Sequence, residues 1–101
     1  MKSHKVSVTV DSQSIQVTPD PLIMTRDDEV HWGGTNPKKF SIVFDGTGPF
    51  SSRELKHADA TRAQRPRVTG RFKYTVVSDD NPSLRLDPDV VVEDPPSKPL
   101  P

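Results

Sequence analysis

Apolar residues in this chain recur at every second position in short runs, and no run follows the period of a helix. Near the start, Val6, Val8 and Val10 alternate with polar residues. The same alternation returns in Val30 and Trp32, in Phe40, Ile42 and Phe44, and in Phe72, Tyr74 and Val76. Period-two patterning is typical of strands with one buried face and one solvated face. The chain is therefore expected to fold mainly as β-sheet.

Turn-forming residues separate these runs. Pro19-Asp20-Pro21, the loop 33–37 and the loop 45–49 are rich in proline, glycine and asparagine or aspartate, which favour turns. About seven short strands separated by such turns predict an all-β, Greek-key β-sandwich. Only residues 51–66 lack the strand pattern, and we expect a surface excursion there with at most one or two helical turns.

The length of 101 residues predicts one domain. Residues 1–93 hold the strand pattern and form the predicted sandwich. Residues 94–101 are rich in proline and cannot pair in a sheet, so we expect a flexible C-terminal tail. Because no apolar stretch is long enough for a signal peptide or a membrane span, a soluble cytoplasmic protein is expected, or a periplasmic one if a leader precedes this sequence.

The chain has no cysteine. Disulfides, thiolate metal sites and cysteine nucleophiles are therefore excluded. The net charge is zero, but its distribution is uneven: residues 53–73 carry seven basic residues against two acidic ones, and residues 79–94 carry six acidic residues against Arg85. Such a separation of charge predicts a dipole that steers encounters with partners.

Four segments together resemble the core strands of the cupredoxins: residues 28–32, 40–44, 70–76 and 89–93. The likeness spans about residues 5 to 93 and implies the sandwich of that family. It also implies a copper site of two histidines, one cysteine thiolate and a weak axial ligand. The alternative is an immunoglobulin-like sandwich, in which Tyr74 would form the tyrosine corner.

The resemblance places the first copper histidine at Phe40, the copper cysteine at Val76 and the axial ligand near Leu86. The second histidine would lie in residues 78–82, which contain none. Blue-copper chemistry requires the thiolate, so we expect no type-1 copper site and no cofactor. Phe40, Val76 and Leu86 would instead fill the cavity with hydrocarbon.

The basic region suggests a function in binding. Arg62, Arg65, Arg67 and Arg71 could dock an acidic protein surface, because guanidinium groups suit bidentate recognition; alternatively they form a solvated face that pairs with residues 79–94. Phe50 either caps the core or, if exposed, anchors a partner. Nucleic acid is not expected, because the domain is neutral overall and we expect no exposed aromatic residues among the arginines for stacking. The leading hypothesis is a monomeric, non-enzymatic module that binds a protein and no membrane.

Three other functions stay open. His4, His31 and His57 could bind a surface metal ion or a small ligand, although their spacing matches no metal motif. An enzyme could use His57 with Ser51, Ser52 and Asp59, although no glycine-framed elbow surrounds either serine. A structural part of a larger assembly could use a sheet edge or the proline-rich tail as its contact.

Overall fold

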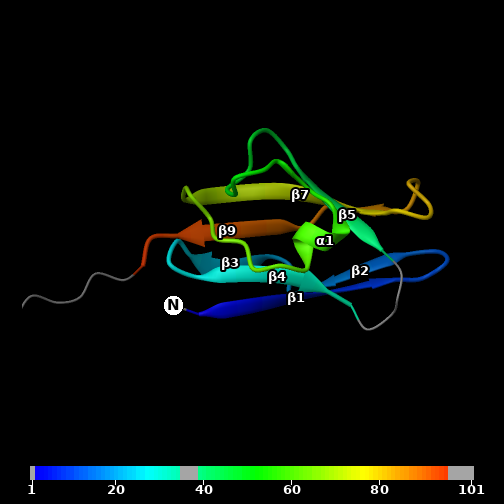
Figure 1. The fold of residues 1–101 in the computed structure, drawn as a ribbon, viewed down its shortest axis with the longest axis horizontal. Helices are drawn as coiled ribbons and strands as arrows, with labels where there is room; N and C mark the ends of the chain where they lie inside the picture. The colour runs from blue at the N-terminus through cyan, green and yellow to red at the C-terminus, as the bar shows by residue number, and fades with distance from the viewer. Residues whose placement is uncertain (1, 35–38, 96–101) are drawn as a thin grey trace, which may run out of the picture.

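The computed structural model describes residues 2–34 and 39–95. Its strands are β1 (Ser3–Val10), β2 (Ile15–Thr18), β3 (Leu22–Thr25), β4 (Glu29–Gly33), β5 (Phe40–Phe44), β6 (Glu54–Leu55), β7 (Gly70–Ser78), β8 (Arg85–Leu86) and β9 (Asp89–Glu93), and its helix is α1 (His57–Ala60). The smaller sheet has the order β2-β1-β4, and the larger has the order β3-β9-β7-β5-β6, with β8 paired to β7. The two sheets lie face to face (Figure 1). The predicted all-β sandwich is confirmed.

The core consists of the inward residues of both sheets, as the alternation predicts. In the larger sheet β5 runs antiparallel to β7, with Ile42 opposite Val76 and Phe44 opposite Tyr74. These four side chains have no exposed surface. Burying apolar surface contributes about 25 cal/mol per Å², so these two central strands account for a large share of the driving force for folding.

Two strand pairs are parallel. In the smaller sheet β1 runs parallel to β4, which places Val6 opposite Trp32. In the larger sheet β3 runs parallel to β9, with Leu22 opposite Val90. Parallel neighbours need a crossover connection, and the chain meets this need by passing between the two sheets. Part of the predicted loop 33–37 lies outside the described residues, because these omit 35–38.

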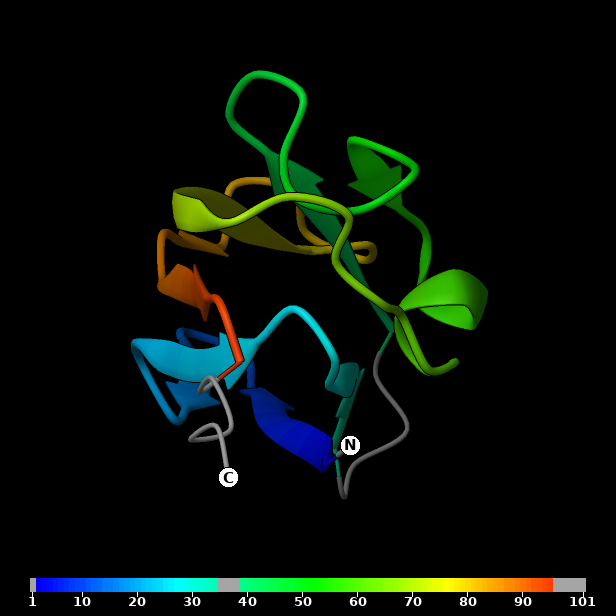
Figure 2. The same cartoon turned by 90° about the vertical axis from the view of Figure 1, so that its left-hand side faces the viewer.

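The expected excursion at 51–66 is present and contains the short strand β6 and the single turn of α1. Leu55 and Ala60 are its buried apolar residues, and a bridge between Gln64 and Val30 fastens its end to β4. Figure 2 shows the segment 61–69 (yellow-green) running on between α1 and β7. The strands β6 and β8 have only two residues each, too few for a pattern in the sequence.

The strand β9 ends at Glu93. Of the predicted tail, residues 96–101 lie outside the described residues. Within residues 2–34 and 39–95, no helix is both long and apolar enough to cross a membrane.

Candidate functional site

Of the three residues that the resemblance aligns with copper ligands, two are buried and one is exposed. Phe40 opens β5 opposite Ser78, and its side chain is 1% exposed. Val76 lies on the neighbouring strand β7 with no exposed surface. Leu86 does not follow the expectation: it lies on the edge strand β8 and keeps 36% of its surface exposed. The prediction that Leu86 fills the cavity was wrong, because an edge strand has a neighbour on one side only.

Leu84, two residues earlier, is the partly buried leucine that packs against the core. The backbone N–H of Ser78 donates to the carbonyl of Leu84 over 3.2 Å. This bond holds the loop between β7 and β8 against the sandwich. Sequence reasoning placed an apolar residue in this loop correctly but assigned the inward position to the wrong leucine.

His57 packs directly on Phe40, a contact that the sequence did not reveal. Its Nδ1 accepts a hydrogen bond from the backbone N–H of Phe40 at 3.2 Å. The two rings meet edge to face with centroids 4.8 Å apart. Among the described residues, no hydrogen bond joins His57 to Ser51, Ser52 or Asp59, so the suggested catalytic group is not assembled.

The other two histidines do not form a metal site with His57. His4 Nε2 lies 3.0 Å from Oδ2 of the buried Asp28, while His31 lies half-buried on β4. The part of the chain that the structure describes contains no group of three or more histidine, aspartate or glutamate residues that could hold a metal ion. Because the chain also lacks the cysteine thiolate, its residues do not fit a blue-copper centre.

Asp28 anchors the start of the chain. Its carboxylate accepts hydrogen bonds from the backbone N–H groups of Lys2 at 2.9 Å and Thr25 at 3.0 Å, besides the contact with His4. Burial raises the pKa of the Asp28 carboxyl, but the hydrogen bonds from Thr25, His4 and Lys2 lower it by more, so that the pKa falls well below its usual range. The network ties β1 to the turn before β4.

Phe50 is a core residue and not an exposed anchor. It is 5% exposed and meets the rings of Trp32 and Phe44 edge to face, with centroids 5.8 Å and 5.4 Å apart. Trp32 in turn donates its indole N–H to the hydroxyl of Tyr74 over 3.2 Å. Burial raises the pKa of the Tyr74 phenol to about 12. The hypothesis that Phe50 anchors a partner was therefore wrong, because this aromatic cluster encloses its ring.

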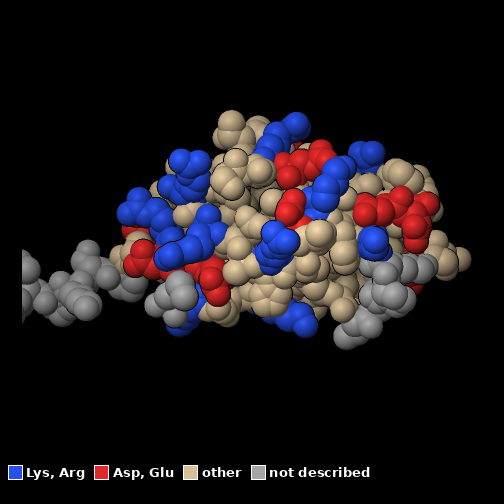
Figure 3. All heavy atoms as spheres, viewed as in Figure 1, with Lys and Arg blue, Asp and Glu red and all other residues tan. Residues whose placement is uncertain are grey.

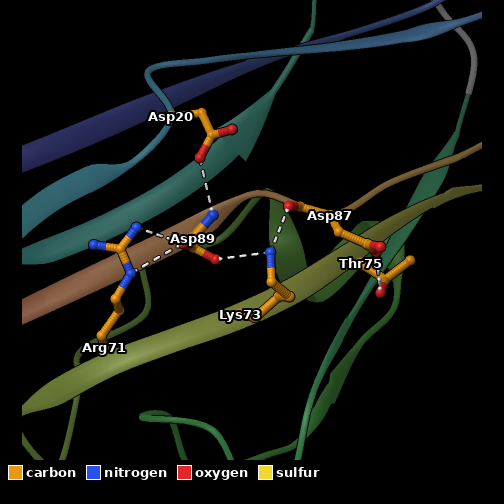
Figure 4. Close-up of polar contacts among 6 residues, drawn as sticks. All are labelled: Asp20, Arg71, Lys73, Thr75, Asp87 and Asp89. Atoms are coloured by element: carbon orange, nitrogen blue, oxygen red, sulfur yellow. Dashed lines mark hydrogen bonds and ion pairs between the residues drawn. The ribbon is translucent and has the colours of Figure 1, made fainter.

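The four predicted arginines divide into two kinds. Arg71 on β7 donates from Nε and Nη2 to Oδ2 of Asp89, at 3.0 Å and 2.6 Å, and Lys73 Nζ lies 3.3 Å from Oδ1 of the same carboxylate (Figure 4). The hydrogen bonds from Arg71 hold the pKa of Asp89 below its usual range. The strand pairing of β7 with β9 thus brings a basic and an acidic segment together. Arg71 belongs to this internal pair.

Arg62, Arg65 and Arg67 lie exposed on the segment 61–69. Arg65 Nη2 donates to the backbone carbonyl of Asp27 at 3.3 Å. Figure 3 shows basic and acidic side chains interspersed on the face that it draws, with no division into two charged regions. Basic and acidic side chains that lie close together in space weaken the dipole that the charged segments of the sequence predict.

Two hollows lie on the described surface. One, of about 560 Å³, is bordered by the loop 46–51 and by Arg53, Arg67 and Val68. The other, of about 320 Å³, lies against Ser41, Val77 and Asp79 on the outer face of the larger sheet. In the second hollow Ser41 Oγ donates to Asp79 at 2.7 Å, and Glu54 pairs with Lys56 at 2.6 Å. Its polar groups are thus already partnered.

Comparison with known proteins defines the class of fold. The sequence matches no protein-family model and no curated protein. A pseudoazurin from Sinorhizobium meliloti matches the structure with a TM-score of 0.65 and 15% identity, over 94% of this chain and 76% of its own. A proline-to-glycine variant of amicyanin in its reduced Cu(I) form matches with a TM-score of 0.53 and 17% identity, over 90% and 82%. The chain therefore has a cupredoxin-like fold.

Within that class, the chain has no cysteine for a copper thiolate, and its described residues contain no group that could hold a metal ion. The immunoglobulin-like alternative is not supported. Its tyrosine corner requires the tyrosine hydroxyl to donate to nearby backbone; among the described residues the hydroxyl of Tyr74 makes no such bond and accepts one from the indole N–H of Trp32.

Proposed function

We propose that this protein is a non-enzymatic interaction module that binds an acidic surface of another protein through Arg62, Arg65 and Arg67. The cupredoxin-like fold supplies a rigid frame. Phe40 and Val76, which the resemblance aligns with copper ligands, are buried hydrocarbon side chains, which supports a function on the surface. These three arginines are the exposed groups that best suit recognition of carboxylates.

The observation that carries the proposal is the contrast between these arginines and Arg71. Over the described part of the chain, no carboxylate lies within ion-pair distance of Arg62, Arg65 or Arg67, whereas Arg71 and Lys73 share Asp89. Exposed guanidinium groups that no carboxylate of the same chain neutralises are available to carboxylates of a partner.

A protein partner fits better than nucleic acid. Stacking of bases needs exposed aromatic rings, but the six aromatic side chains of this protein are buried or packed against the core. The protein itself is proposed to be a monomer, because the exposed large apolar side chains among the described residues, Ile23, Val68 and Leu86, belong to β3, the segment 61–69 and β8. Extended apolar patches mark stable interfaces between subunits.

The test is a pull-down from lysate with three versions of the tagged protein. The variant Arg62→Glu/Arg65→Glu reverses two charges on the proposed surface. The control Lys39→Glu/Arg85→Glu changes the net charge by the same amount at exposed positions outside the segment 61–69. We expect a partner that the wild type and the control retain and the first variant loses. Equal retention by all three versions would exclude this surface.

A further inference from the structure

The larger hollow lies beside the proposed surface and shares Arg67 with it. One wall is the loop 46–51 that follows β5, and the other is Arg67 with Val68. The backbone N–H of Arg67 donates to the carbonyl of Pro49 over 2.7 Å and holds the two walls together. The volume of about 560 Å³ is in the range of sites that bind small ligands and short peptide segments.

Two guanidinium groups border this groove. Arg53 Nε donates to the carbonyl of Phe44 at 2.9 Å, which uses one of its five N–H donors and fixes the direction of the side chain. Within residues 2–34 and 39–95, no carboxylate lies within ion-pair distance of Arg53 or Arg67. The charge of the groove is therefore positive and is complementary to a carboxylate from outside.

The rest of the lining is apolar or carries hydroxyl groups. Phe50 and Pro49 are buried beneath it, and Val68 is 49% exposed. Gly48 has φ +67°, and a Cβ there would lie 2.7 Å from Phe44. The loop therefore has a shape at this position that a residue with a side chain could not adopt without strain. The backbone of the loop lies directly against Phe44 here, and the groove begins at the core.

We propose that this groove binds an acidic residue and the apolar residue next to it in an extended segment of the partner protein. The carboxylate lies between Arg53 and Arg67, and the apolar side chain covers Val68 and the edge of Phe50. This inference rests on the proposed function, because it takes the partner to be an acidic protein, and it adds the chemistry of the segment that is recognised.

The probe is the capped dipeptide acetyl-Glu-Leu-amide, titrated into ¹⁵N-labelled protein and followed by amide chemical shifts. The matched control is acetyl-Gln-Leu-amide, which has the same shape without the charge. For so small a ligand we expect a dissociation constant of about 1–10 mM, with shifts confined to the backbone amides that border the groove, at residues 46–48, 50, 51, 53, 67 and 68. The control should bind about tenfold more weakly, as the loss of a charge-assisted hydrogen bond predicts.

Two variants test the assignment of the arginines. Arg67→Gln removes a side chain with no hydrogen bond or ion pair to the described residues, so the fold is expected to persist, and the affinity for acetyl-Glu-Leu-amide should fall about tenfold. Arg53→Gln should have a similar effect. Equal binding of the two dipeptides, no change in these amide shifts up to about 50 mM of the acidic dipeptide, or binding of inorganic phosphate as tight as that of the acidic dipeptide would each overturn the inference.

The inference and the proposed function fail in different ways. If the partner is lost by Arg62→Glu/Arg65→Glu but the acidic dipeptide does not bind, the interaction module stands and the groove is excluded as its recognition site. If the acidic dipeptide binds in the groove but the partner is retained by all charge-reversal variants, the groove stands as a peptide site and the role of Arg62 and Arg65 is excluded.

Discussion

Replacing Gly48 and Gly46 separately by alanine should affect stability very differently, although both have nearly the same backbone conformation. Their φ angles are +67° and +64°, so each alanine incurs the left-handed penalty of about 1–2 kcal/mol. A Cβ at Gly46 meets nothing within 4 Å, whereas a Cβ at Gly48 lies 2.7 Å from both Cβ and Cγ of Phe44.

Phe44 cannot move away cheaply. It has no exposed surface, and its ring lies 5.4 Å from that of Phe50 and 5.3 Å from that of Tyr74, centroid to centroid. Crowding in a packed core adds about 1–3 kcal/mol. We therefore expect Gly46→Ala to lower the free energy of unfolding by about 1–2 kcal/mol and Gly48→Ala by about 2–5 kcal/mol.

The assay is urea unfolding followed by the fluorescence of Trp32, the only tryptophan, with the midpoint and slope fitted for each variant. The difference between the two variants isolates the contact with Phe44, because the backbone penalty cancels. Equal losses of stability would refute the reasoning, and so would a larger loss for Gly46→Ala. A changed slope would mean that the unfolded state had also been altered.

Three further results are expected. Asp28→Asn should lower the free energy of unfolding by about 2–4 kcal/mol at pH 7, because the buried carboxylate loses charge-assisted hydrogen bonds. Folding lowers the pKa of Asp28, so the carboxylate stabilises the fold fully above its unfolded pKa of about 3.9, and this stabilisation is lost as the pH falls below that value. The urea melts of the wild type and of Asp28→Asn should therefore converge in acid. A difference in stability that stays constant with pH would argue against the network. Tyr74→Phe leaves the buried indole N–H of Trp32 without its acceptor and should lower the free energy of unfolding by about 1–3 kcal/mol; a melt identical to that of the wild type would contradict the role of this bond. The melting temperature should be the same with and without a chelator, and a drop with the chelator would reveal a bound metal.

The sequence predicted the inward faces well because alternation records which side chains point to the core. Phe40 and Val76 could be assigned to the interior from the alternation of their strands, and both are buried; their match to copper-ligand positions stays a prediction from the resemblance. Leu86 could not, since its exposure depends on the two-residue length of β8. A strand of two residues is too short to show an alternation of apolar and polar residues.

The contacts between distant segments were the harder part. Arg71 lies beside Asp89 because β7 pairs with β9. His57 packs on Phe40 because the excursion at 51–66 places the start of α1 against the start of β5. Neither depends on residues close in sequence. Phe50 looked exposed because it follows a glycine-rich turn, yet that turn folds back over Trp32 and Phe44.

The most direct test of the proposed function is a pull-down with the tagged wild-type protein from lysate, at low and at physiological salt. The proposal predicts an acidic protein, recovered in stoichiometric amount at physiological salt and released as salt is raised further, because screening weakens exposed charge pairs. Recovery at low salt alone, or no recovery, would contradict it and reduce Arg62, Arg65 and Arg67 to a solvated surface.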